Sequence, residues 1–323
     1  MRRSSTGRVQ LLGFLAIALA GASGCKSASA PPPVAFTSED WSYRGAKGRK
    51  LTSDHYELFT TCKSKPFVDA MPGFMETCWS AYEKLISPFA PPKKCETYLF
   101  GSRRQWEQFT EEFAPARAAI YKRIRSGGYS ERGLTVSHYD TQRSTLSVLA
   151  HEGLHQYLEV TRSREVPAWL NEGLACYFEA FELDAHNRPT FTPTKNYLRT
   201  PGLREALTGK NLIPIKEILG THAGIEVQKK AVQVRNYYSQ EWALIVMLMR
   251  PKKENSYHEA FQLLLAEMGT DTMLRKANAM MAADTEGGMT LGEAVFQAYL
   301  SDDLAGFQAE YEAYLHKLMD MDG

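Results

Sequence analysis

The chain has 323 residues and a formal net charge of +1, which is enough for one large domain or two modest ones. Its apolar fraction of 44% and charged fraction of 23% lie near the averages for soluble globular proteins. The sequence has no Lys/Arg-dense stripe interleaved with aromatic residues, the pattern usual in nucleic-acid-binding proteins, so we expect no nucleic-acid partner.

Residues 1–24 have the pattern of an export signal. Arg2, Arg3 and Arg8 precede an apolar run at 11–20, and small residues follow that run. The apolar run is too short for a transmembrane helix, which needs roughly 20 residues. We therefore expect export of the chain and removal of this segment, so that it forms no part of the mature fold.

The signal ends in Ala22-Ser23-Gly24-Cys25, which resembles the bacterial lipobox. The resemblance implies lipidation of Cys25 and a bacterial cell-envelope protein held on a membrane by that lipid. Lys26 differs from the Asp that resembles an inner-membrane retention signal, which favours the outer membrane. An aliphatic residue is commoner where Ala22 stands, so the alternative is an ordinary cleaved signal with Cys25 as a stray thiol. Residues 25–50 begin with a Ser/Ala/Pro-rich stretch and are expected to form a tether.

Strands and helices are mixed in the first half of the mature chain, whereas helices alone fill the second half. This order predicts an α+β fold with an N-terminal subdomain at 51–165 and a helical C-terminal subdomain at 166–323. The expected strands are 51–62, 95–101 and 133–139. The expected helices are 74–86, 102–113, 144–160, 167–182, 236–250, 256–268, 271–283 and 290–318.

The helix at 144–160 carries His151-Glu152-Gly153-Leu154-His155, an H-E-x-x-H pattern. Residues i and i+4 of a helix share one face, so both imidazoles can bind one ion, and Zn²⁺ accepts such nitrogen ligands. Glu152 lies at the edge of that face, where its carboxylate could hold a zinc-bound water without binding the metal. Gly153 in mid-helix costs about 1 kcal/mol relative to Ala, which suggests close approach of another element.

A third ligand is available downstream in Val166-Pro-Ala-Trp-Leu-Asn-Glu-Gly-Leu174. Pro167 suits the first turn of a new helix, and Glu172 lies one turn inside that helix. Two antiparallel helices joined by a short turn would bring Glu172 to His151 and His155. A catalytic zinc needs three protein ligands and a free fourth position, so the three side chains complete a catalytic set.

These motifs resemble those of the gluzincin zinc metallopeptidases, in which H-E-x-x-H is followed by a glutamate, often within W-L-N-E-G. Within that group the chain is most similar to bacterial lipoprotein-type, peptidase-MA-like proteins of the DUF1570 kind. The resemblance implies a zincin-like fold and Zn²⁺ as cofactor. It also implies Tyr238 as the donor to the oxyanion, although the helix around Tyr238 is apolar and favours a core role equally.

Four cysteines remain after the signal, and an exported chain would let them oxidise. Three pairings are possible. One bridge among the first three is plausible, Cys176 is expected as a buried free thiol, and the connectivity stays open. These cysteines are Cys62, Cys78, Cys95 and Cys176.

The expected reaction is zinc-dependent hydrolysis of peptide bonds in a peptide or protein substrate, with Glu152 as general base. The strand at 133–139 could accept an extended substrate by edge pairing. Gly73-Phe-Met-Glu-Thr77 looks like the amine-anchoring motif of aminopeptidases, but it lies too far upstream, which favours endopeptidase action. The alternative is a catalytically silent zincin-fold lipoprotein that binds a peptide or an envelope partner.

Overall fold

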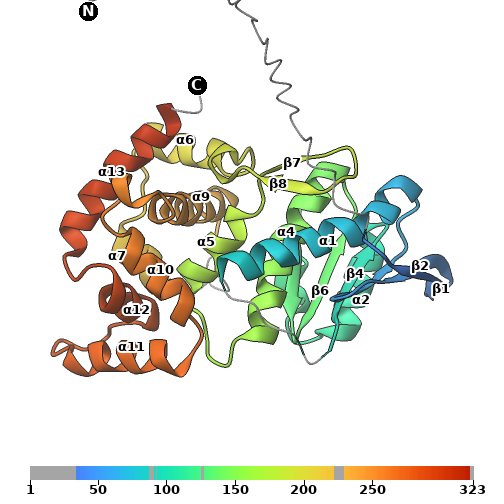
Figure 1. Cartoon of the computed structure of the whole chain (residues 1–323), viewed down its shortest axis with the longest axis horizontal. Helices are drawn as coiled ribbons and strands as arrows, with labels where there is room; N and C mark the ends of the chain where they lie inside the picture. The colour runs from blue at the N-terminus through green and yellow to red at the C-terminus, as the bar shows by residue number, and fades with distance from the viewer. Residues whose placement is uncertain (1–33, 87–90, 92, 125–126, 222–228, 321–323) are drawn as a thin grey trace, which may run out of the picture. The chain divides into compact units, whose positions relative to one another are not determined.

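A six-stranded mixed sheet fills the N-terminal half of the computed structural model, which describes residues 34–86, 91, 93–124, 127–221 and 229–320 (Figure 1). The strand order is β1-β2-β3-β4-β6-β5, so β1 and β5 are the two edges. The pairs β3–β4 and β4–β6 are parallel and the other neighbours are antiparallel. The strands are β1 Thr37–Tyr43, β2 Ala46–Thr52, β3 Tyr56–Thr60, β4 Cys95–Phe100, β5 Gly128–Glu131 and β6 Leu134–His138.

Helices cover both faces of this sheet. One face packs on α1 (Lys65–Leu85) and α4 (Gln142–Thr161), and its core side chains include Leu58 and Leu99. The opposite face packs on α2 (Arg103–Phe113) through a second cluster that includes Phe100, Trp106 and Val136. Successive side chains of a strand point to opposite faces, which explains how Leu99 and Phe100 enter different clusters. The helix α4 is therefore fixed on the sheet and supplies a rigid base for the residues that it carries.

The absence of a side chain at Gly153 lets α1 approach α4 closely. A Cβ atom there would lie 3.0 Å from the Tyr82 hydroxyl oxygen and 3.4 Å from the terminal methyl of Met75. The Tyr82 hydroxyl donates a hydrogen bond of 2.6 Å to the carbonyl of Ala150. The close approach expected at this glycine is confirmed, and it holds α4 in place beside α1.

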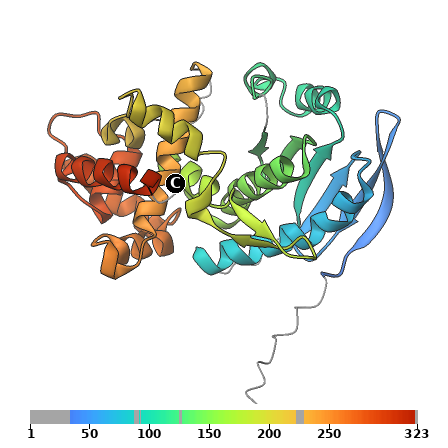
Figure 2. The same cartoon turned by 90° about the horizontal axis from the view of Figure 1, so that it is seen from above.

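The C-terminal half is mostly helical and is built around α9 (Ala231–Leu248), whose residues from 239 to 248 are all buried. Figure 1 shows α9 among its neighbours, and α5 (Ala168–Tyr177), α6 (Thr200–Thr208) and α13 (Leu304–Asp320) contact it. Figure 2 shows the sheet beside these helices, with β1 and β2 at the edge far from them. One hydrophobic core runs through both halves. The remaining elements are α3 Ala118–Tyr121, β7 Phe181–Leu183, β8 Pro189–Phe191, α7 Ile215–Gly220, α10 His258–Glu267, α11 Asp271–Ala283 and α12 Leu291–Tyr299.

The α+β fold class predicted from the sequence is confirmed, although several boundaries differ. The expected tether at 25–50 is too long, because β1 and β2 form a hairpin from Thr37 onward. The single helix expected at 290–318 is two helices, α12 and α13, separated at 300–303. The helix expected at 167–182 ends at Tyr177, and the next residues lead into β7.

The cysteines of the described chain are all free, so the expected bridge among Cys62, Cys78 and Cys95 is wrong. Cys176 is a buried free thiol, as expected. Burial raises the pKa of the Cys176 thiol to about 11, so this thiol keeps its proton at neutral pH. Among the described residues, no helix combines the length and apolar character that crossing a bilayer requires. Cys25 and the export signal lie outside the described residues.

Gly173 of α5 allows a close contact between two helices of the C-terminal half, α5 and α9. A Cβ atom there would lie 2.5 Å from Ile245 Cγ1 and 2.8 Å from the carbonyl oxygen of Glu241, both on α9. We expect Gly173→Ala to lower the free energy of unfolding by about 1–3 kcal/mol, the usual cost of overpacking. Urea denaturation would measure this change in the free energy of unfolding.

The matched control is Gly73→Ala in α1, where a Cβ atom would meet no atom within 4 Å. Both changes gain the same helix propensity, so Gly73→Ala should be neutral or stabilising by up to about 1 kcal/mol. Equal stabilities for the two variants would contradict close packing at Gly173.

Candidate metal centre

Three side chains from α4 and α5 converge on one point. The α4 helix begins at the N-cap Thr141, whose hydroxyl accepts from the Ser144 amide, and it carries His151 and His155 one turn apart. The α5 helix begins after Pro167 and carries Glu172 toward them. The distance between the two Nε2 atoms is 3.1 Å, and Glu172 Oε2 lies 3.4 Å from each. The structure thus brings together the three side chains that the sequence predicts as metal ligands.

The spacing of these three atoms fits one small metal ion. Bonds of about 2.0–2.1 Å from a tetrahedral ion to its ligands require ligand atoms about 3.3–3.4 Å apart. The observed separations of 3.1, 3.4 and 3.4 Å agree with that requirement. Two imidazole nitrogens and one carboxylate oxygen are also the donor types of a catalytic zinc site. The donor set and its geometry both fit a metal ion, with the fourth position left for another ligand.

Hydrogen bonds at the far side of each ring orient the two imidazoles. His151 Nδ1 lies 2.9 Å from Glu179 Oε1, and His155 Nδ1 lies 2.8 Å from Asn171 Oδ1. Both partners are acceptors, so both Nδ1 atoms carry the proton and donate it. When both imidazoles are neutral, the two Nε2 lone pairs therefore face each other across 3.1 Å. A cation between them would turn this repulsion into ligation.

The Glu172 carboxylate carries the negative charge of the group. Its Oε2 atom is buried and accepts no hydrogen bond. Burial favours the protonated acid, but the positive charge that the His155 and His151 imidazoles can carry outweighs it and holds the Glu172 pKa well below its usual range. Burial likewise lowers the pKa of His155, and Glu172 more than offsets it, so that the net shift is upward. The electrostatics favour a positive charge between these three side chains.

Glu152 lines the same cleft as the three predicted ligands, and it takes no part in the ion pairs that join them. It is buried, with 7% of its surface exposed, and burial raises its pKa. A carboxylate with a raised pKa takes up a proton more readily. A Cβ atom at Gly128 of β5 would lie 3.1 Å from Glu152 Cγ, so this glycine leaves room for the side chain. The Glu152 carbonyl accepts a hydrogen bond of 2.9 Å from the Ser130 hydroxyl, which fixes its backbone to the sheet edge.

Tyr238 of α9 lies against the same group. Its ring centroid is 6.4 Å from that of His151, and the residue lines the same cleft as the ligands. Burial raises the pKa of Tyr238, so its hydroxyl keeps the proton that a donor needs. No described residue forms a hydrogen bond with this hydroxyl.

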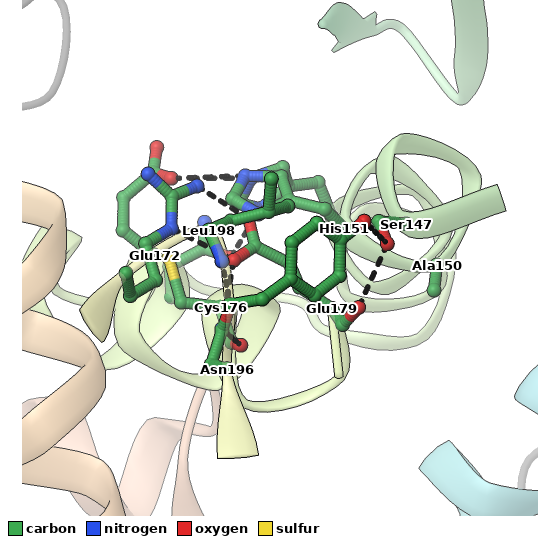
Figure 3. Close-up of polar contacts among 12 residues, drawn as sticks. Ser147, Ala150, His151, Glu172, Cys176, Glu179, Asn196 and Leu198 are labelled. Atoms are coloured by element: carbon green, nitrogen blue, oxygen red, sulfur yellow. Dashed lines mark hydrogen bonds and ion pairs between the residues drawn. The ribbon is translucent and has the colours of Figure 1, made fainter. Parts of the chain in front are cut away.

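A polar network behind His151 is the part of the site that sequence analysis missed (Figure 3). Glu179, with 3% of its side chain exposed, accepts from His151, from Asn196 Nδ2 at 3.0 Å and from Arg199 Nε at 2.7 Å. Burial would raise its pKa, but Arg199 and His151 lower it to about 2. These residues belong to no recognisable motif, because Glu179 follows α5 and the other two lie in the loop before α6 and at the start of that helix.

A second group could in principle also hold a metal. His151, Cys176 and Glu179 offer ligand atoms within 4.8 Å of one another. Both Glu179 oxygens already accept hydrogen bonds from Arg199, however, and His151 donates from Nδ1 to the same carboxylate. A cation at that point would face the Arg199 guanidinium, so the group around Glu172 is the better metal site.

A cleft of about 700 Å³ opens over the three ligands. Its walls include the edge strand β5, the helix α3 and the exposed side of α4. The expectation that the strand at 133–139 receives a substrate by edge pairing is wrong, because β6 lies between β4 and β5. The free edge beside the site belongs to β5, at Gly128–Glu131.

Residues 145–266 match a family model. Its description is "Protein of unknown function (DUF1570)", and the resemblance to DUF1570 proteins is therefore confirmed over this segment. The segment contains the three convergent ligands, Glu152, the Glu179 network and Tyr238. No curated protein matches the chain.

Proposed function

We propose that the protein is a zinc-dependent peptidase of the gluzincin type. The observation that carries the proposal is the convergence of His151 Nε2, His155 Nε2 and Glu172 Oε2 at separations of 3.1–3.4 Å. A cleft opens over these three atoms. These three residues would hold Zn²⁺. A structural zinc site closes its fourth position with protein, whereas a site that opens to a cleft is typical of catalysis.

Each remaining residue has a chemical role in hydrolysis. When bound, the zinc would lower the pKa of a water toward about 7 and polarise the scissile carbonyl. Glu152 takes the proton of the attacking water and passes it to the leaving amine, for which its raised pKa suits it. Tyr238 donates its hydroxyl proton in a hydrogen bond to the carbonyl oxygen as negative charge develops there.

The cleft supports a peptide substrate in extended form. The β5 edge offers unpaired main-chain groups next to Glu152, and the apolar side chains Ile120, Ile124 and Leu158 line the same space. The Glu76 carboxylate of the aminopeptidase-like stretch is bound elsewhere, by the Ser53 hydroxyl at 2.6 Å and the His55 ring at 2.6 Å. It cannot anchor a free amine in the cleft, which favours endopeptidase action.

The rival function is a zincin-fold lipoprotein that binds a peptide or an envelope partner without hydrolysis. The same cleft and strand edge would serve that function. The raised pKa of Glu152 and its place beside the ligands favour catalysis, because binding alone requires no buried base.

We further propose that the enzyme acts in the bacterial cell envelope, held on the outer membrane by a lipid on Cys25. Its substrates would then be peptides or proteins of the envelope.

The roles of ligand and base can be separated by two substitutions. His155→Ala removes one of three ligands, so zinc per molecule should fall well below one. Glu152→Gln keeps the shape of the side chain and removes its basicity, so zinc should stay near one while hydrolysis falls by at least roughly 10²–10⁴-fold. Metal analysis and a peptide-library digest read by mass spectrometry would measure both.

Two outcomes would change the proposal. Wild-type protein prepared without chelator that carries no zinc would falsify the metal site. Wild-type protein that holds zinc and cleaves nothing in a broad library would favour the binding-protein alternative.

Tyr238→Phe tests the oxyanion donor. The variant should fold, keep its zinc and lose about 10²–10³-fold in kcat, the usual cost of one such donor. The control is Tyr177→Phe, a half-buried tyrosine at the end of α5 that does not line the cleft. A lower Tm with unchanged activity per folded molecule would instead assign Tyr238 to the core.

Expression in a bacterial host tests the lipid anchor. Wild-type protein should require detergent for extraction, whereas Cys25→Ser should accumulate as unlipidated precursor that retains its signal. Mass spectrometry of the N-terminal peptide identifies the acyl groups. Fully processed, soluble wild-type protein would show that Cys25 is not acylated.

A further inference from the structure

The Arg199 side chain contacts both Glu179, which orients His151, and Tyr238. Its Nε donates to Glu179 Oε2 at 2.7 Å, and its Nη2 donates to Glu179 Oε1. The contact is thus a two-point pair between a guanidinium and a carboxylate, the geometry that arginine forms and lysine cannot. Glu179 in turn accepts the Nδ1 proton of His151. Arg199 is therefore one hydrogen-bonded residue away from a proposed zinc ligand.

The same guanidinium packs on the proposed oxyanion donor. Its central carbon lies 5.0 Å from the centroid of the Tyr238 ring, within the range of a cation–π contact. Only 18% of the Arg199 side chain is exposed, so the contact is shielded from water. The tyrosine ring also contacts the His151 ring, whose centroid is 6.4 Å away.

The backbone of Arg199 is fixed to the helix that carries Tyr238. The Ser239 hydroxyl donates a hydrogen bond of 2.8 Å to the Arg199 carbonyl. Three residues later, Gly202 lets α6 approach α9, since a Cβ atom there would lie 2.5 Å from Ser239 Oγ and 3.1 Å from the Arg235 carbonyl oxygen. The position of Arg199 thus depends on α9, and its side chain reaches back to the residue that orients His151.

We propose that Arg199 is a positioning residue that fixes the orientation of His151, through Glu179, together with the place of Tyr238. The inference rests on the proposed function. Without the guanidinium, Glu179 would be a buried carboxylate short of its strongest donors, and both the imidazole and the phenol would lose a fixed neighbour. A ligand and an oxyanion donor on different helices are thereby held in one arrangement.

Arg199→Met and Arg199→Lys test this role. Methionine keeps much of the apolar stem and removes the charge, and we expect zinc affinity to fall by about 10–100-fold, as for loss of an outer-shell partner. Lysine keeps the charge without the planar fork, so it should restore part of the affinity. Competition with a chromophoric chelator gives the zinc Kd. The d–d absorption of the Co²⁺-substituted protein reports the ligand geometry and should change in both variants.

The control is Arg235→Met, which removes an arginine–glutamate pair between the same two helices. Arg235 contacts Glu205 at 2.9 Å and both side chains are about half exposed, so zinc affinity and the Co²⁺ spectrum should stay as in the wild type. If Arg199→Met fails to fold, the Lys variant alone decides. Its zinc Kd should then rise at least severalfold.

Coupling to Tyr238 is measured by a double-mutant cycle on kcat. If Arg199 acts through Tyr238, the rate losses of Arg199→Lys and Tyr238→Phe should be less than additive. A folded Arg199 variant with wild-type zinc Kd and Co²⁺ spectrum, beside a wild type that binds one zinc, would overturn this inference and leave the proposed function intact. A wild type that binds no zinc would overturn the proposed function itself.

Discussion

The burial of the Glu172 carboxylate against two imidazoles is the interaction on which the site depends. An unpaired carboxylate in such a place would be costly, and Oε2 of Glu172 accepts no hydrogen bond among the described residues. In the neutral imidazoles the two Nε2 atoms that face it are lone-pair acceptors, because the rings donate from Nδ1 to Glu179 and Asn171. Three acceptors within 3.4 Å of one another are stable only around a positive charge. The fold around them has to keep this arrangement from relaxing.

Two glycines allow the helices that carry the ligands to pack closely enough. Gly153 lets α1 press on α4 from behind, while Gly173 lets α9 press on α5. A larger residue at either place would push one ligand helix away from its support. Because Gly173 follows Glu172 directly, the contact that brings α9 and Tyr238 near the site also fixes the third ligand. The proposed third ligand, Glu172, and the glycine that permits the helix contact, Gly173, are thus adjacent in the sequence.

The sequence predicts those parts of the site whose residues follow the period of a helix or form a compact motif. The i, i+4 spacing of His151 and His155 and the proline-started helix of Glu172 were sufficient to place the ligands, because helix geometry is local. Sequence analysis misses the β1–β2 hairpin because its strands are mostly polar and only Leu51 is buried, so they lack the apolar alternation that marks a half-buried strand. The edge strand was assigned to the wrong segment, since strand order is not encoded within any one strand. The network of Glu179, Asn196 and Arg199 could not be predicted, because its members meet only after α5, the loop and α6 pack together.

The place of Glu152 bears on the choice between hydrolysis and binding alone. A metal held only to bind a ligand needs no proton acceptor beside it, and a buried ionisable side chain carries a desolvation cost. Here the sheet edge instead makes room for the carboxylate, through the missing side chain at Gly128, and holds its backbone through Ser130. Burial then raises its pKa, which strengthens it as a base. A proton transfer would give this buried ionisable group a chemical use, and for this reason we propose hydrolysis ahead of the rival function.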